Sequence, residues 1–194
     1  MDNTNKIKDT PKVASYETEQ DVLLMRAVQE GDDGAFRILV QKWKNPLVNF
    51  FYKSLSDAHI SEDLTQQVFI NLYKARENYQ AKAKFSTYLF YIARRILINN
   101  YRSNKNKPLD SYEYSHIEQI AVERNSKQAE LEEIFEKVVL SLPEKQRTAI
   151  LLLKQQELSY EEIAKAMNAG ITSVKTWIHR ARTTLRQELK KYDR

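Results

Sequence analysis

Polar and basic side chains recur at helical spacing near the C-terminus, where they could bind DNA. They are Ser173, Lys175, Thr176, His179, Arg180, Arg182 and Arg186. Lys and Arg bind phosphate, and polar side chains near a helix start reach base edges in the major groove. Presenting such a face requires a short partner helix and a tight turn. A helical hairpin with a solvated basic face would give the same pattern, so this segment alone leaves both readings open.

The sequence just before this face predicts the partner helix and the turn. Ser159 and Glu162 have the spacing of a capping box, which opens a short helix. Residues 168–170 (NAG) supply the break, because Asn and Gly can take left-handed backbone angles. We expect Thr172 or Ser173 to cap the second helix. Its inward-facing residues should be Val174, Ile178, Ala181 and Leu185.

Residues 74–102 combine cations with aromatic rings. The cations are Lys74, Arg76, Lys82, Lys84, Arg94, Arg95 and Arg102, and the aromatic residues are Tyr79, Phe85, Tyr88, Phe90, Tyr91 and Tyr101. A groove with cations and aromatic faces is typical of single-strand binding, where bases stack on side chains. Aromatic residues at helical spacing are also common in cores. The core candidates are Phe85, Leu89 and Ile92. The candidates for exposure, since a phenol tolerates water, are Tyr88, Tyr91 and Tyr101.

Charge is distributed unevenly along the 194 residues, whose net charge is +5. Residues 74–102 hold seven Lys or Arg and one Glu, and residues 143–194 hold eleven basic and six acidic residues. Residues 1–73 and 103–142 each have a net charge of −3. Two basic blocks between acidic stretches suggest two contacts with a polyanion. Solvated helix faces are the alternative reading.

Composition excludes several classes of protein and site. The absence of Cys excludes disulfides, thiolate zinc sites and Cys nucleophiles. The polar N-terminus is unlike a signal peptide, and the apolar run of residues 85–93 is too short to span a membrane, so we expect a soluble, intracellular protein. No P-loop, paired His or catalytic constellation is visible. We therefore expect no enzyme activity, cofactor, metal or small-molecule substrate.

Few Gly and Pro and a 3.6-residue apolar period predict an all-α fold. In the first half we expect a helix over residues 20–30 and a second one around Phe36–Leu47, which Pro46 should bend or divide. A third helix should begin near Ser61 as its N-cap, and a fourth should span residues 86–101. In the second half a helix should end near Pro143. The predicted organisation is a polar tail (1–19), a helical domain (20–102), a flexible linker (103–127) and a second helical domain (128–192).

Four segments together resemble a known family. They are residues 61–69 (SEDLTQQVF), 85–95 (FSTYLFYIARR), 142–147 (LPEKQR) and 173–182 (SVKTWIHRAR). In order and spacing they are similar to bacterial RNA polymerase sigma factors of the sigma-70 family, and the small size resembles its extracytoplasmic-function (ECF) group. The resemblance implies a region 2 helical bundle and a region 4 helix-turn-helix. The sequence departs from the family at three positions. Gln67 stands where an acidic residue is common, Tyr88 where Trp is common, and Trp177 where a polar residue is common.

The resemblance also implies roles for individual residues. Core polymerase would be bound by Asp63, Gln66, Gln67 and Phe69. The minus-ten element and the non-template strand would be held by Tyr79, Lys82, Lys84, Tyr88, Tyr91, Arg94, Arg95, Asn99 and Arg102. The minus-thirty-five element would be read by Ser173, Lys175, Thr176, His179 and Arg180. The linker would thread toward the polymerase active-site channel.

The implied partners are core RNA polymerase, promoter DNA and an anti-sigma factor, commonly membrane-bound, in a bacterial cytoplasm and on the nucleoid. Three alternatives compete with this reading. A stand-alone helix-turn-helix regulator would need a dimer interface and leaves residues 61–102 unexplained. A protein that mimics a sigma domain should have lost its DNA-facing cations, whereas Arg94 and Arg180 are present. A nucleic-acid-processing enzyme lacks a visible catalytic set.

Overall fold

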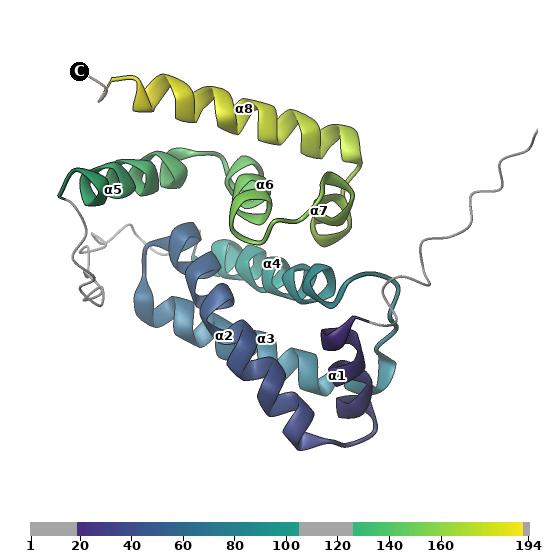
Figure 1. Cartoon of the computed structure of the whole chain (residues 1–194). Helices are drawn as coiled ribbons and strands as arrows, with labels where there is room; N and C mark the ends of the chain where they lie inside the picture. Colours follow the sequence, from purple (N-terminus) through teal and green to yellow (C-terminus); the bar gives the residue numbers. More distant parts are fainter. Residues whose placement is uncertain (1–18, 105–125, 192–194) are drawn as a thin grey trace, which may run out of the picture.

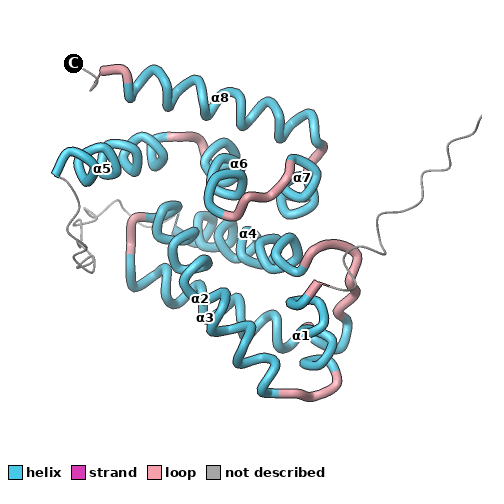
Figure 2. The backbone as a smooth tube through the Cα atoms, in the orientation of Figure 1, coloured by secondary structure: helices cyan, strands magenta, loops and turns pink. Residues whose placement is uncertain are grey.

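The computed structural model describes residues 19–104 and 126–191, and within them the regular structure is helical throughout (Figures 1 and 2). The first half contains α1 (Gln20–Gln29), α2 (Asp33–Leu55), α3 (Ala58–Lys74), the short 3-10 helix η2 (Arg76–Asn78) and α4 (Phe85–Asn104). The second half contains α5 (Ser126–Ser141), α6 (Glu144–Gln155), α7 (Tyr160–Met167) and α8 (Ile171–Leu189). The all-α prediction is confirmed. The expected N-terminal tail and most of the expected linker lie outside the described residues.

Large aromatic side chains hold the first four α-helices together. Phe50 and Phe90 are fully buried, and their rings meet edge to face with centroids 5.4 Å apart. Trp43 lies against the same cluster and donates its indole N–H to buried Asp21 over 3.2 Å. Lys42 Nζ also lies 2.7 Å from Asp21, so the carboxylate that joins α1 to α2 is neutralised. The resulting core fixes α4 against α2 and α3.

The structure corrects the predicted cap of α3 and decides one of the two outcomes predicted for Pro46. Helix α3 begins at Ala58, and Asp57 caps it by accepting the amide of Ile60 over 2.8 Å. Ser61 instead lies buried inside the helix and donates its hydroxyl to the carbonyl of Asp57. Pro46 does not divide α2, which runs unbroken through it. The fully buried Leu47 next to it anchors α2 in the core, which compensates for the lost backbone hydrogen bond.

The C-terminal half contains the predicted helix-turn-helix. Ser159 and Glu162 form the predicted capping box at the start of α7, and Asn168 ends it in a left-handed conformation with φ 47°. All four apolar residues expected to face inward from α8 are buried. The predicted cap is wrong, because α8 begins at Ile171 with Gly170 as N-cap and has no side-chain cap.

The two halves of the described chain pack against each other. Helix α7 contacts α4, and α5 and α6 contact α2. Figure 1 shows α6 and α7 between α4 on one side and α8 on the other. Helix α8 therefore lies on the outside of the molecule, while one side of α4 is turned toward the second half. Among the described helices, none is long and apolar enough to cross a membrane.

Candidate nucleic-acid interface

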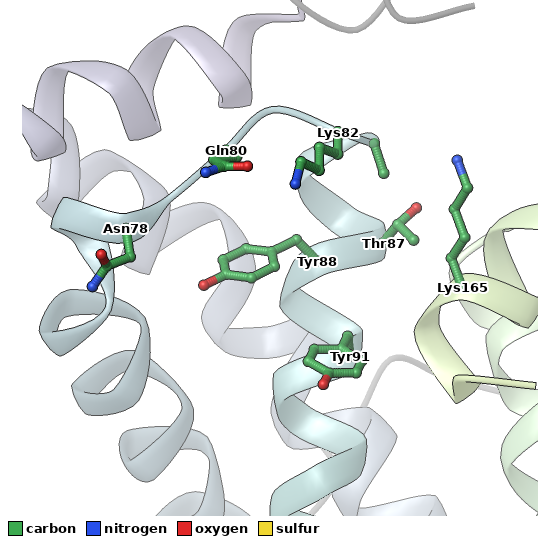
Figure 3. Close-up of a pocket in the computed structure, with 8 residues that line it drawn as sticks. Asn78, Gln80, Lys82, Thr87, Tyr88, Tyr91 and Lys165 are labelled. Carbon is green, nitrogen blue, oxygen red and sulfur yellow. The ribbon is translucent and has the colours of Figure 1, made fainter.

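A hollow opens between α4 and the loop that follows η2. It has a volume of about 510 Å³, within the range of roughly 300–1,000 Å³ that ligand pockets occupy. Figure 3 shows Tyr88 and Tyr91 on one wall, Asn78, Gln80 and Lys82 around the opening, and Lys165 of α7 on the opposite side. Aromatic faces beside amides and ammonium groups can stack a base and hold its phosphate. The hollow thus has the groups that an unstacked nucleotide requires.

Tyr79, a predicted single-strand contact, lies below this hollow rather than in it. Its side chain is buried, and its ring centroid is 5.3 Å from that of Tyr88. Burial, assisted by Glu19, raises the pKa of Tyr79 to about 12. The hydroxyl has no hydrogen-bond partner among the described residues. Tyr79 supports the ring of Tyr88 and does not face solvent.

The hollow continues along α4 into a second groove. Tyr88 and Tyr91 line both, and Arg95 and Asn99 extend the groove by one further helical turn. The Arg95 guanidinium lies 5.7 Å from the centre of the Tyr91 ring. Arg95, Asn99 and Arg102 are exposed and follow Tyr91 on the same side of the helix. We call this side, from Tyr88 to Arg102, the open face of α4.

Three other predicted or candidate residues lie on the side of α4 that the second half covers. Lys84 Nζ lies 2.9 Å from Glu162, and Arg94 Nη2 lies 3.9 Å from Glu144. Tyr101, expected to be exposed, is half-buried like Tyr88 and Tyr91, and its hydroxyl is engaged within the protein. Its hydroxyl donates to the carbonyl of Ser54 over 3.0 Å and accepts from Arg147, and burial raises its pKa.

Helix α8 exposes every residue predicted to read duplex DNA: Ser173, Lys175, Thr176, His179 and Arg180. Thr176 donates its hydroxyl to the carbonyl of Thr172, which leaves the hydroxyl oxygen available as an acceptor. Trp177 is half-buried against the core, with Lys145 Nζ 5.6 Å from its ring centre. The basic face is thus continuous on the outer side of α8, and Trp177 belongs to the packing beneath it.

The predicted polymerase-contacting residues lie on α3. Asp63, Gln66 and Gln67 are exposed, and Gln67 donates to Asn71 Oδ1 over 2.8 Å. Phe69 is buried, edge-on to Phe36, at the base of a hollow between α2 and α3.

Sequence reasoning missed Ile70, a large apolar residue of α3 that is 46% exposed. Its position off the apolar stripe of α3 is the signal that could have identified it. The α3 surface therefore combines the carboxylates of Glu62 and Asp63 with two amides and one exposed apolar group. Among the described residues, no cluster of three His, Cys, Asp or Glu could hold a metal ion.

Each half of the chain matches the model of a known protein family. Residues 39–107 match the model of sigma-70 region 2, and residues 132–185 match that of sigma-70 region 4. Over 177 residues the chain is 31% identical to the ECF RNA polymerase sigma factor SigW of Bacillus subtilis, covering 86% of this chain and 95% of SigW. It is 32% identical over 182 residues to the RNA polymerase sigma-H factor of Pseudomonas aeruginosa, and this match covers 88% of this chain and 94% of the sigma-H factor.

Solved structures show the same fold. CnrH, solved in complex with the cytosolic domain of CnrY, superposes with a TM-score of 0.69 at 20% identity, covering 89% of this chain and 99% of CnrH. RpoE of Bartonella quintana, solved with the anti-sigma factor NepR, superposes with a TM-score of 0.66 at 24% identity, and the match covers 80% of this chain and 96% of RpoE.

Proposed function

The chain belongs to the ECF group of RNA polymerase sigma factors in the sigma-70 family, and we propose that α3, α4 and α8 divide the work of transcription initiation between them. The family acts in initiation. In this proposal α3 binds core RNA polymerase, α4 holds the melted minus-ten region, and α8 reads the minus-thirty-five element. The proposal keeps the predicted units, 20–102 and 128–192, although α4 extends to Asn104 and α5 begins at Ser126.

The observation that carries the proposal is the open face of α4. It places two aromatic rings and Arg95 beside a hollow large enough for a base. Extruding a base costs a few kcal/mol of stacking, which an aromatic pocket and backbone cations can offset. A protein that binds only double-stranded DNA does not need such a surface, because stacked bases do not expose their faces.

The exposed face of α8 supports the assignment to duplex DNA. Lys175, Thr176 and His179 lie in its first half, where a recognition helix meets base edges. Arg180 follows one turn after Thr176 and can contact guanine or phosphate. On α3, Asp63 and Gln66 would pair with polar groups of core polymerase while Ile70 buries apolar surface.

Two further parts of the proposal rest on relatives. Structural neighbours were solved with CnrY and with the anti-sigma factor NepR, so we propose that an anti-sigma factor binds this chain as well. We also propose that the protein acts in the bacterial cytoplasm and joins the nucleoid when active.

Reconstituted transcription tests the proposal. The purified chain, bacterial core polymerase and fragmented genomic DNA are combined, and transcript starts are mapped with and without the chain. We expect starts that depend on the chain and share two spaced upstream motifs. Binding of duplex DNA by a homodimer, with no dependent starts, would overturn it in favour of a stand-alone regulator.

A further inference from the structure

Three large apolar side chains are about half exposed in the part of the chain that the structure describes: Leu23 (50%), Ile38 (49%) and Ile70 (46%). Leu23 of α1 and Ile38 of α2 line the same groove, which lies between these two helices and has a volume of about 610 Å³. Leu24 and Ala27 of α1 add further apolar surface to it. Single exposed apolar residues are ordinary, but several gathered in one groove mark a binding surface.

Charged groups lie at two places along this groove. Asp32 lines it at the turn between α1 and α2, and the exposed Asp33 comes next. Arg37 lines it about one helical turn further along α2. Asp32 accepts the amide of Ala35 through Oδ1, which leaves the carboxylate with further acceptor capacity. A chain segment that complements the groove therefore carries a cation for the turn, a carboxylate for Arg37 and apolar side chains between them.

The N-terminal tail carries these groups in the required order. Residues 12–17 (KVASYE) begin with a cation, continue with an aliphatic and an aromatic side chain, and end with a carboxylate: Lys12, Val13, Tyr16 and Glu17. Residues 1–18 lie outside the described residues, so the match rests on their sequence and on the place where they join the described chain.

The tail joins the described chain beside the groove. Glu19, the residue before α1, accepts the backbone amide of Phe85 over 3.3 Å through its carboxylate, and the next residue, Gln20, lines the groove. Helix α1 is about 15 Å long, whereas the chain from Lys12 to Glu19 can span up to about 25 Å. Lys12 can therefore reach the turn that holds Asp32. A site on the same chain meets its tethered segment at an effective concentration on the order of millimolar, so a weak fit is enough.

We propose that residues 12–17 bind in the groove between α1 and α2, so that the chain covers its own apolar surface. The segment runs antiparallel to α1: Tyr16 lies against Leu23 and Ile38, and Lys12 pairs with Asp32 at the far end. Burying the Tyr16 ring there removes apolar area from water, which stabilises the contact. This contact is independent of the proposed roles of α3, α4 and α8.

Zero-length carbodiimide coupling tests the contact in the full chain, because this reagent joins an amine to a carboxylate that touches it. We expect a cross-linked peptide pair that joins Lys12 to Asp32 or Asp33, identified by mass spectrometry. Lys12→Arg should abolish this product, since a guanidinium keeps the charge without coupling. Absence of the product in the wild-type chain overturns the proposal.

Substitutions of the apolar residues show whether their fit holds the tail in the groove. Tyr16→Ser and Ile38→Ser should each lower the yield of the product severalfold, because they remove the apolar contact and leave the coupled groups in place. Ile70→Ser is the matched control. It removes an isoleucine of nearly equal exposure from α3, outside the groove, and should leave the yield unchanged. An undiminished yield in Tyr16→Ser and Ile38→Ser, or an equal loss in the control, overturns the proposal.

Isotope mixing distinguishes the chain's own tail from the tail of a second copy. Unlabelled and isotope-labelled chains are mixed before coupling. A link within one chain joins peptides of the same isotope, whereas a link between copies also joins unlabelled to labelled peptides. We expect same-isotope products. Mixed products at the frequency of random pairing would mean that the tail of a second copy fills the groove, which overturns the contact within one chain.

Discussion

The ring centroids of Tyr79 and Tyr88 lie 5.3 Å apart and the rings are tilted by 53°, with Tyr79 buried and Tyr88 half-buried in the lining of the hollow. The two tyrosines therefore have different roles, although both occur in the same basic and aromatic stretch. The buried Tyr79 ring packs against the Tyr88 ring and supports it. Of the two, only Tyr88 lines the hollow, so it is the ring that can stack on a base.

Tyr79→Phe should leave single-strand binding unchanged and should not destabilise the fold. The hydroxyl is buried without a partner, so its removal relieves an unmet desolvation cost, which is about 1–3 kcal/mol for such groups. Thermal unfolding and fluorescence anisotropy would check both expectations. Tyr88→Ala is the contrasting change and should weaken the same binding by about 1–3 kcal/mol, the value of one stacked base. A large loss of stability in Tyr79→Phe would show that the hydroxyl has a partner.

Pro46→Ala should stabilise the protein. Pro46 lies inside α2, where it cannot donate a backbone hydrogen bond to the preceding turn. Proline is about 3 kcal/mol less favourable than Ala in a helix interior, although its stiffness in the unfolded chain offsets part of that difference. We expect a higher midpoint in urea with an unchanged slope. A lower midpoint would mean that the Pro46 ring contributes packing that Ala cannot replace.

Asp63→Ala should weaken binding to core polymerase without affecting DNA binding by the free chain. Asp63 is exposed on α3, away from the α4 and α8 faces, so its loss removes a contact and leaves the core intact. Surface plasmon resonance with immobilised core polymerase would measure the change. Glu30→Ala is the control, because it removes an exposed carboxylate that lies outside α3. Parallel losses of polymerase and DNA binding would indicate misfolding.

Local periodicity predicted most of this fold and of the α8 face. Val174 and Ile178 recur at one helical turn and are buried, which leaves Lys175 and His179 exposed. Periodicity did not identify the first residue of a helix where two nearby residues could both cap it. Asp57 and Ser61 are both good N-caps, and only the packing of Ser61 within α3 shows which one begins the helix.

Contacts between distant residues were not accessible from periodicity. Tyr101 carries the pattern of an exposed phenol, yet Ser54 and Arg147 bind it from segments far away in the chain. Lys84 and Arg94 likewise have the sequence signature of phosphate ligands, and nothing local indicates that Glu162 and Glu144 oppose them. A helical pattern reports which side of a helix is polar, but it does not report what meets that side.

Arg180→Ala should weaken recognition of the upstream promoter element by about 1–3 kcal/mol if Arg180 contacts a base. The side chain is exposed on α8, so its truncation should not affect folding. Binding of the free chain to duplex promoter fragments, measured over a range of salt concentrations, separates the two possible roles. Loss of a base contact relaxes the preference at one position, whereas loss of a phosphate contact weakens all sequences alike and reduces the salt dependence by about one ion. An unchanged promoter profile would contradict the assignment.

The stability supplied by Glu162 should depend on pH. Burial raises the pKa of its carboxyl, but hydrogen bonds from Ser159 and the pairing with Lys84 outweigh burial and hold that pKa below its usual value. A carboxyl with a lowered folded-state pKa stabilises the protein above its unfolded pKa of about 4.3, and this contribution disappears as the pH falls through the folded value. Wild type should therefore exceed Glu162→Gln in unfolding free energy at about pH 7, and the two should converge near about pH 3. Urea unfolding at both pH values checks this, with Glu161→Gln as the exposed neighbour that should show no such convergence. A difference between wild type and Glu162→Gln that persists at low pH would mean that side-chain packing, and not the charge of Glu162, joins α7 to Lys84.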